Sequence, residues 1–191
     1  MSIATRHGDS GETNLPDGQR VSKADPRVEC YGVIDELVSQ MGVARSICED
    51  AEMKQWLKAM QRDLFKVGAA MSVAPEFGRP ATKIEPEMIA VLDEHVRRAE
   101  ATEGILKDWA LPGELPASAA LDVARAVCRR AERLAVHLAE QGVISNPPVL
   151  AYLNRLSDVL WLFGRLIELR AKVDSSLRDN PGSAPPWSRA W

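Results

Sequence analysis

The sequence predicts an all-α protein, built as a five-helix up-and-down bundle. Apolar residues recur three and four positions apart over long stretches, no stretch gives a convincing strand, and Pro and Gly residues interrupt the pattern. Long antiparallel helices joined by short connections form bundles of this kind. At 191 residues the chain fits one domain with a sizeable core.

The first two helices are expected near residues 28–48 and 51–71. Each carries an apolar stripe with the spacing of one helix face. The stripes comprise Cys30, Ile34, Leu37, Met41, Ala44 and Cys48 in the first helix, and Met53, Trp56, Met60, Leu64, Val67 and Met71 in the second. We interpret both stripes as bundle core.

The other three helices are predicted from their boundary signals. A break over 74–83 that contains Pro and Gly precedes a moderately apolar helix near 85–101. The fourth helix follows a Leu-Pro-Gly-Glu-Leu-Pro run, with Ser118 as its candidate N-cap, and extends to about residue 140. The fifth should reach about residue 172, because Asn146 can cap it while the next two prolines occupy its first turn.

Composition indicates a compact cytoplasmic domain. The net charge of −3, from 24 basic and 27 acidic residues, gives no support for a nucleic-acid partner. The cysteines Cys30, Cys48 and Cys128 fall in apolar helical registers, which predicts buried, reduced thiols. The sequence contains no Cys-x-x-Cys motif and no His/Cys cluster, so we expect no metal site of that kind. It contains no long apolar run, so we expect neither secretion nor a membrane span.

Two arginines four residues apart are the most informative feature. Arg125 and Arg129 lie one turn apart on the same face of the fourth helix, where two cations repel each other. The buried face beside them is marked by Ala124, Val127, Cys128, Ala131 and Leu134. The pair therefore indicates an anion site, and the alternative is a solvated charged face.

A second polar cluster lies at the N-terminus. Residues 5–14 contain two glycines, three hydroxyl side chains and an arginine, and Lys23 follows. Glycines let backbone N–H groups face a ligand, while hydroxyl groups and a lysine supply donors for phosphate oxygens. The pattern is not a Walker-type loop, and the alternative is a disordered terminus.

Six segments together resemble the PduO-type ATP:cob(I)alamin adenosyltransferases, in family order from about residue 3 to about residue 170. They are Thr5-Arg-His-Gly-Asp-Ser-Gly-Glu-Thr13, Arg20-Val-Ser-Lys23, Tyr31-Gly-Val-Ile-Asp-Glu-Leu37, Leu111-Pro-Gly113, Arg125-Ala-Val-Cys-Arg-Arg-Ala-Glu-Arg133 and Tyr152-Leu-Asn-Arg-Leu-Ser-Asp158. With the nucleotide-binding N-terminus that the resemblance implies (1–27), the chain divides into three segments. The other two are the helical bundle (28–172) and a tail (173–191) in which Trp187 and Trp191 are candidate packing anchors.

The resemblance also implies a reaction and its residues. Cob(I)alamin attacks the 5′ carbon of ATP and expels triphosphate, with magnesium on the phosphates, so the protein binds, aligns and stabilises the leaving group. The residues matched to catalysis are Arg125, Arg129, Asp35 and Trp109. Those matched to ATP are Thr5, Arg6, His7, Gly8, Thr13, Asn14, Lys23, Arg129, Arg130, Glu132, Arg133 and Asn154.

Asp35 bears on assembly. It sits between Ile34 and Leu37, and a carboxylate buried at such a register needs a cation. The resemblance pairs it with Arg125 of a neighbouring subunit, which implies a homotrimer with its active site between subunits. The alternative is an ion pair within one chain. A flavoprotein reductase and an adenosylcobalamin-dependent mutase are the further partners implied.

The chain departs from the family pattern where the corrinoid should sit. Trp109 replaces a phenylalanine that keeps the lower axial ligand off cobalt, and Glu114, Asp122 and Val38 replace a glycine, a histidine and an asparagine. In the phosphate loop, His7 replaces a hydroxyl residue. Two alternatives to an active enzyme follow: a non-catalytic paralogue that binds ATP or a corrinoid for delivery or regulation, and a bundle used only for protein interaction.

Overall fold

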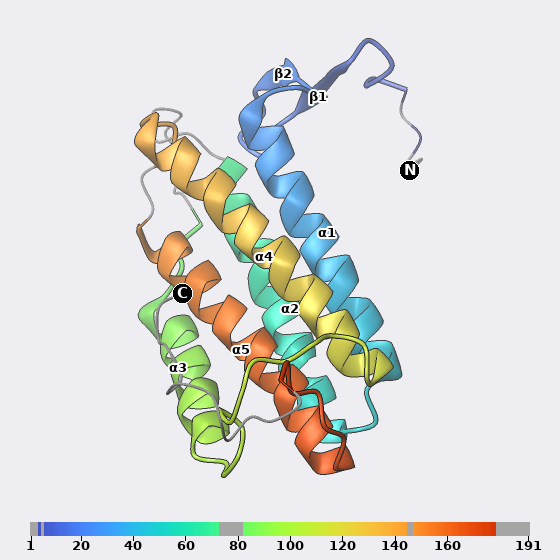
Figure 1. The fold of residues 1–191 in the computed structure, drawn as a ribbon. Helices are drawn as coiled ribbons and strands as arrows, with labels where there is room; N and C mark the ends of the chain where they lie inside the picture. Colours follow the sequence, from blue (N-terminus) through green and yellow to red (C-terminus); the bar gives the residue numbers. More distant parts are fainter. Residues whose placement is uncertain (1–3, 5, 73–81, 145–146, 179–191) are drawn as a thin grey trace.

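The computed structural model of the protein describes residues 4, 6–72, 82–144 and 147–178. Its helices are α1 (Pro26–Ile47), α2 (Ala51–Ser72), α3 (Pro86–Glu100), α4 (Pro116–Glu140) and α5 (Pro147–Ala171). Consecutive helices run in opposite directions (Figure 1). The predicted five-helix bundle is confirmed, with each boundary within about three residues of its expected place.

The packing order follows from the apolar stripes. Helix α4 packs against both α1 and α5, α2 packs on α1, and α3 lies against α5 (Figure 1). Both predicted stripes face the core, where Trp56 is partly buried and the other members are buried. In the described ranges no helix combines the length and apolarity that a membrane span requires.

The cysteines behave as the sequence predicts. All three are free thiols buried in the bundle. Burial raises the pKa of the Cys30 thiol to about 12, and Glu29 adds to this effect. A thiol held protonated in this way is not a nucleophile at neutral pH, so Cys30 serves packing.

Two expectations about local structure were wrong. The N-terminal segment contains a small antiparallel hairpin, β1 (Glu12–Asn14) and β2 (Arg20–Ser22), with Thr13 opposite Val21. Strands of three residues are too short for an alternating pattern to be visible in the sequence. The N-cap residue of α4 is Leu115, not Ser118, because the proline that follows Leu115 already fits the first turn. The buried Ser118 hydroxyl instead donates to the Leu115 carbonyl over 3.0 Å.

Some expected features fall on residues whose placement is not described. Asn146, the expected cap of α5, lies outside the described residues, as do Trp187 and Trp191 and most of the 74–83 break.

The start of α1 is clear, because the Asp25 side chain accepts a hydrogen bond of 2.8 Å from the Arg27 backbone N–H.

An aromatic cluster attaches α3 to the bundle. The ring of His95 lies 4.7 Å from that of Trp56 and 5.4 Å, edge-on, from that of Phe163. Burial lowers the pKa of His95, and the charge of Arg98 lowers it further. The folded state therefore favours the neutral imidazole.

We expect acid to destabilise the protein partly through His95. Its pKa is lower in the folded chain than the ~6.5 of an unfolded histidine, so the unfolded chain binds a proton first as pH falls. The contribution of His95 is complete above about pH 6.5 and is lost as pH falls below it. In urea unfolding at about pH 7.5 and about pH 5.5, His95→Phe should reduce the loss of unfolding free energy. An equal loss in both proteins would contradict this role.

Candidate functional site

Arg125 and Arg129 line a cavity between α3, α4 and α5. Its volume is about 470 Å³. Helix α5 contributes a polar edge, and α3 and α5 contribute apolar and aromatic side chains. Its lining comprises Val96, Glu100, Leu106, Arg125, Arg129, Asn154, Arg155, Asp158, Trp161 and Leu162. The cavity thus combines a cationic, polar wall with an apolar, aromatic one.

Positively charged side chains outnumber negatively charged ones in the lining of this cavity. Burial and the neighbouring charge of Arg129 lower the pKa of Arg125, although an arginine stays protonated at neutral pH. Burial raises the pKa of Asp158, while Arg155, which donates to it over 3.1 Å, opposes that change. Arg155 also pairs with Asp93 of α3. Two half-buried cations on one helix face suit a multiply charged anion.

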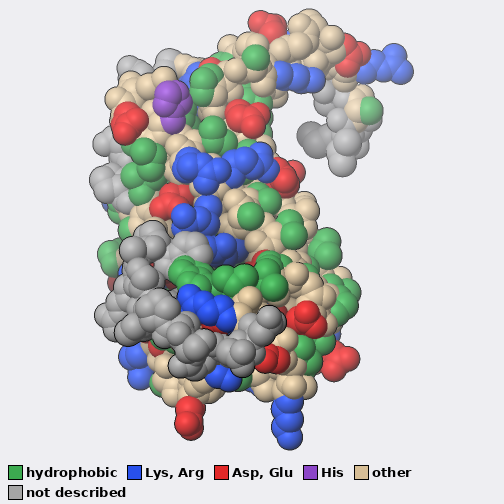
Figure 2. All heavy atoms as spheres, in the orientation of Figure 1, with side chains coloured by type: hydrophobic (Ala, Val, Ile, Leu, Met, Phe, Trp, Pro, Cys, Tyr) green, Lys and Arg blue, Asp and Glu red, His purple; other side chains and the backbone are tan. Residues whose placement is uncertain are grey.

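The polar residues beyond Arg129 on α4 engage their neighbours. Asn154 of α5 donates a hydrogen bond of 3.1 Å to the Glu132 carboxylate. Arg130 pairs with Glu36 of α1, and Arg133 is exposed. Figure 2 shows Lys and Arg side chains gathered in a column on the face where α4 lies in front. The structure therefore brings Asn154 and Glu132 together beside the cavity that Arg129 lines, whereas Arg130 is turned toward α1.

The N-terminal part of the predicted ATP set lies elsewhere. Arg20 organises it, donating to the Glu12 carboxylate (2.9 Å), to the Asn14 side chain (3.3 Å) and to the His7 carbonyl (2.7 Å). The Lys23 ammonium packs so close to Gly8 that a Cβ there would lie 3.1 Å from its nitrogen.

This N-terminal hairpin projects beyond the start of α1 (Figure 1). Of the described residues in 4–23, none lines the arginine cavity. Thr5 lies outside the described residues. A single chain therefore keeps the two halves of the predicted ATP set apart.

Asp35 is not buried, contrary to the expectation from its register. It lies on the exposed side of α1, because a helix turns 100° per residue and carries it off the face of Ile34. It borders a groove between α1 and α2, with Phe65, 67% exposed, at the other side. Glu36, not Asp35, forms the ion pair from α1 to α4. Asp35 and Arg125 border different hollows of the chain.

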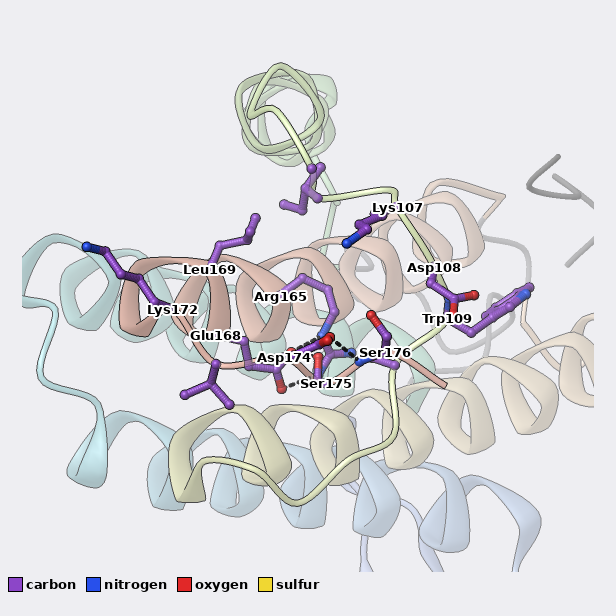
Figure 3. A pocket seen from close by; sticks show the side chains of 14 residues that line it. Lys107, Asp108, Trp109, Arg165, Glu168, Leu169, Lys172, Asp174, Ser175 and Ser176 are labelled. Atoms are coloured by element: carbon purple, nitrogen blue, oxygen red, sulfur yellow. Dashed lines mark hydrogen bonds and ion pairs between the residues drawn. The ribbon is translucent and has the colours of Figure 1, made fainter. Parts of the chain in front are cut away.

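Trp109 lies on the long connection between α3 and α4, at a second cavity. Its backbone carbonyl accepts a 2.7 Å hydrogen bond from the Leu177 N–H. The Leu111 N–H donates to the Ser175 carbonyl over 2.8 Å, which completes a short antiparallel bridge. Figure 3 shows the Trp109 side chain pointing away from the cluster of polar residues in this cavity of about 310 Å³.

A buried charge cluster beneath this bridge was not predicted from the sequence. Arg165 of α5 donates to Asp122 of α4 (2.7 Å) and to Glu168 (2.7 Å). Burial alone would lower the pKa of Arg165, but these carboxylates raise it. The available signal was an Arg and a Glu three residues apart inside an otherwise apolar stretch of α5.

Comparison with known proteins gives consistent results. The family model "Cobalamin adenosyltransferase" matches residues 3–167. A corrinoid adenosyltransferase of Citrobacter freundii is 40% identical over 172 residues, 90% of this chain and 97% of that protein. The corrinoid adenosyltransferase PduO of Salmonella typhimurium is 37% identical over 94% of this chain, which spans 53% of that longer protein.

Solved structures agree. A variant of the PduO-type ATP:corrinoid adenosyltransferase from Lactobacillus reuteri, complexed with cobalamin and ATP, matches the fold with a TM-score of 0.86. It is 31% identical, and the match covers 94% of this chain and 100% of that one.

Proposed function

The chain belongs to the cobalamin adenosyltransferase family, and we propose that it transfers the 5′-deoxyadenosyl group of ATP to cob(I)alamin or a related corrinoid, releasing triphosphate. The observation that carries this proposal is the cavity around Arg125 and Arg129. Its cationic wall suits a polyphosphate, and the apolar wall with Trp161 suits a flat, largely apolar ring.

In this reaction the chain supplies no nucleophile. The attacking centre is the cobalt of the substrate, so the side chains hold ATP in line and stabilise the charge that develops on the triphosphate. Arg129 and Lys23 neutralise that charge, and Asn154 with Glu132 borders the nucleotide. The described residues contain no group of three His, Cys, Asp or Glu side chains placed for a metal ion. We expect magnesium to enter bound to the phosphates of ATP.

We place the active site between subunits of a homotrimer. The support is that one chain separates the hairpin and Asp35 from its own arginine cavity. The apolar groove beside Asp35, with the exposed Phe65, gives a neighbouring subunit a surface to cover. A contact between two different surfaces closes into a ring when repeated by rotation. Asp35 of one subunit then meets Arg125 of the next.

Co-expression of two inactive variants tests this arrangement. Lys23→Ala and Arg129→Ala should each be nearly inactive alone. In randomly mixed trimers about one quarter of the sites receive an intact Lys23 and an intact Arg129 from different subunits, and activity should return to about that fraction. Activity that stays at the level of the single variants would place both residues in one subunit's site.

The reaction itself is tested with ATP and chemically reduced cobalamin. Formation of adenosylcobalamin, followed by its visible spectrum, is the expected result. ATP binding without product would instead support the non-catalytic paralogue. We also expect a cytoplasmic location, where a flavoprotein reductase supplies the reduced corrinoid and an adenosylcobalamin-dependent mutase uses the product.

A further inference from the structure

The segment that carries Trp109 is fastened to the bundle by the buried cluster around Arg165. We propose that Arg165 is a positioning residue, which acts through Asp122, Glu168 and Ser175 to fix Trp109 at the corrinoid. This inference rests on the proposed function. It gives a role to the charged side chains of Arg165, Asp122 and Glu168, which are not among the residues proposed to bind ATP.

The first step is the attachment of Trp109 to the chain that follows α5. The Trp109 carbonyl and the Leu111 amide both bond to residues 175–177. Beside them, the buried Asp108 carboxylate accepts from the Arg178 guanidinium (3.0 Å) and from its backbone N–H (3.1 Å). These bonds tie the connection between α3 and α4 to residues 174–178, so the position of Trp109 depends on where that segment is held.

The second step is the attachment of residues 174–178 to the helices. The Ser175 hydroxyl donates to Glu168 over 2.5 Å. The guanidinium of Arg165 binds both oxygens of Glu168 and both oxygens of Asp122. Arg165 thereby joins α4, α5 and the segment at one point. Its contact with Glu168 is drawn in Figure 3. The side chains of Arg165 and Glu168 are only 5% and 3% exposed, and that of Asp122 is 9% exposed.

Burial of this cluster favours a positioning role over a role in stability. Removing three charges from water has a large desolvation cost, and their mutual attraction often does no more than offset this cost. A planar guanidinium that binds two carboxylates in a forked geometry fixes direction as well as distance. Such an arrangement suits a segment that lacks helical or sheet support of its own.

The same guanidinium lies next to the arginine cavity. The central carbon of Arg165 lies 5.4 Å from the ring centroid of Trp161, within the range of a cation–π contact. Trp161 lines the cavity of Arg125 and Arg129. Arg165 therefore lies between the cavity proposed for ATP and the loop of Trp109, where it can fix the position of the loop relative to the cavity.

The test uses two mild variants, because Arg165→Ala would leave two buried carboxylates without their cation. Arg165→Lys keeps the charge but loses the forked geometry, and Ser175→Ala cuts the segment from Glu168. Both should lower turnover about tenfold, a fraction of the ~10²-fold that a 1 Å misplacement can cost, with ATP affinity unchanged. Asp174→Asn is the matched control, since the described hydrogen bonds of Asp174 all go to Ser176, within the segment.

Two further measurements separate positioning from stability. Combined with Trp109→Ala, neither variant should cause an additional loss, because both act through Trp109. Amide hydrogen exchange of residues 109–111 should be faster in both Arg165→Lys and Ser175→Ala than in the wild type. This measurement does not depend on turnover. If the wild type made no adenosylcobalamin, the proposed function would fail while faster exchange still supported the positioning network. Wild-type turnover in both variants, or losses that multiply with that of Trp109→Ala, would overturn the inference.

Discussion

Arg129→Ala should weaken ATP binding by about 1.5–3 kcal/mol, roughly 10- to 150-fold, because a charge-assisted contact to phosphate is lost. The bundle should stay folded, since Arg129 is half-buried at the wall of the cavity and the core side of α4 is formed by other, mostly apolar residues. Removal of Arg129 also relieves its repulsion of Arg125. Calorimetric titration with ATP, together with thermal unfolding of the ligand-free protein, measures both effects.

A matched control removes an arginine of another surface. Arg97 of α3 has a side chain that is 72% exposed and pairs with Glu94. An exposed pair of this kind contributes little, so Arg97→Ala should bind ATP like the wild type. Wild-type affinity in Arg129→Ala would remove Arg129 from the nucleotide site. Equal weakening in both variants would reduce the effect to the net charge of the chain.

The bundle was predictable because its helices are long and periodic. The stripe from Met53 to Met71 repeats over five turns, so a single exception such as the half-exposed Trp56 does not obscure it. The hairpin at Thr13 and Val21 offers three residues per strand, which gives a periodic pattern nothing to repeat. The Arg20 side chain adds long-range bonds to Glu12 and to the His7 carbonyl, which no local pattern reports.

The candidate site was predictable only in its parts. Spacing along one helix placed Arg125 and Arg129 on a shared face, and this is confirmed by the cavity that they line. Spacing does not report which neighbours a face meets, so the exposure of Asp35 and the pairing of Glu36 with Arg130 were missed. The Arg165 cluster joins positions 43 residues apart, a separation that no local pattern encodes.

Trp109→Ala should lower turnover on the order of 10- to 100-fold while ATP affinity changes little, because the lost contact belongs to the reacting centre. In the proposed reaction Trp109 covers the corrin face where the lower ligand would coordinate, which makes cobalt easier to reduce. Trp109→Phe should retain most of the activity, since a phenyl ring also excludes water there. Steady-state kinetics with varied ATP and varied corrinoid separates the two affinities.

The spectrum of bound cob(II)alamin gives a readout that does not depend on turnover. Loss of the lower ligand changes this spectrum, so the wild type should show the change and Trp109→Ala should not. Leu111→Ala is the control, because Leu111 is 52% exposed two residues away and the substitution keeps the N–H that donates to Ser175. If Trp109→Ala showed the same spectrum as the wild type, Trp109 would not shield cobalt. If Leu111→Ala lost the change as well, the loop as a whole would hold the corrinoid, with no special part for the indole ring.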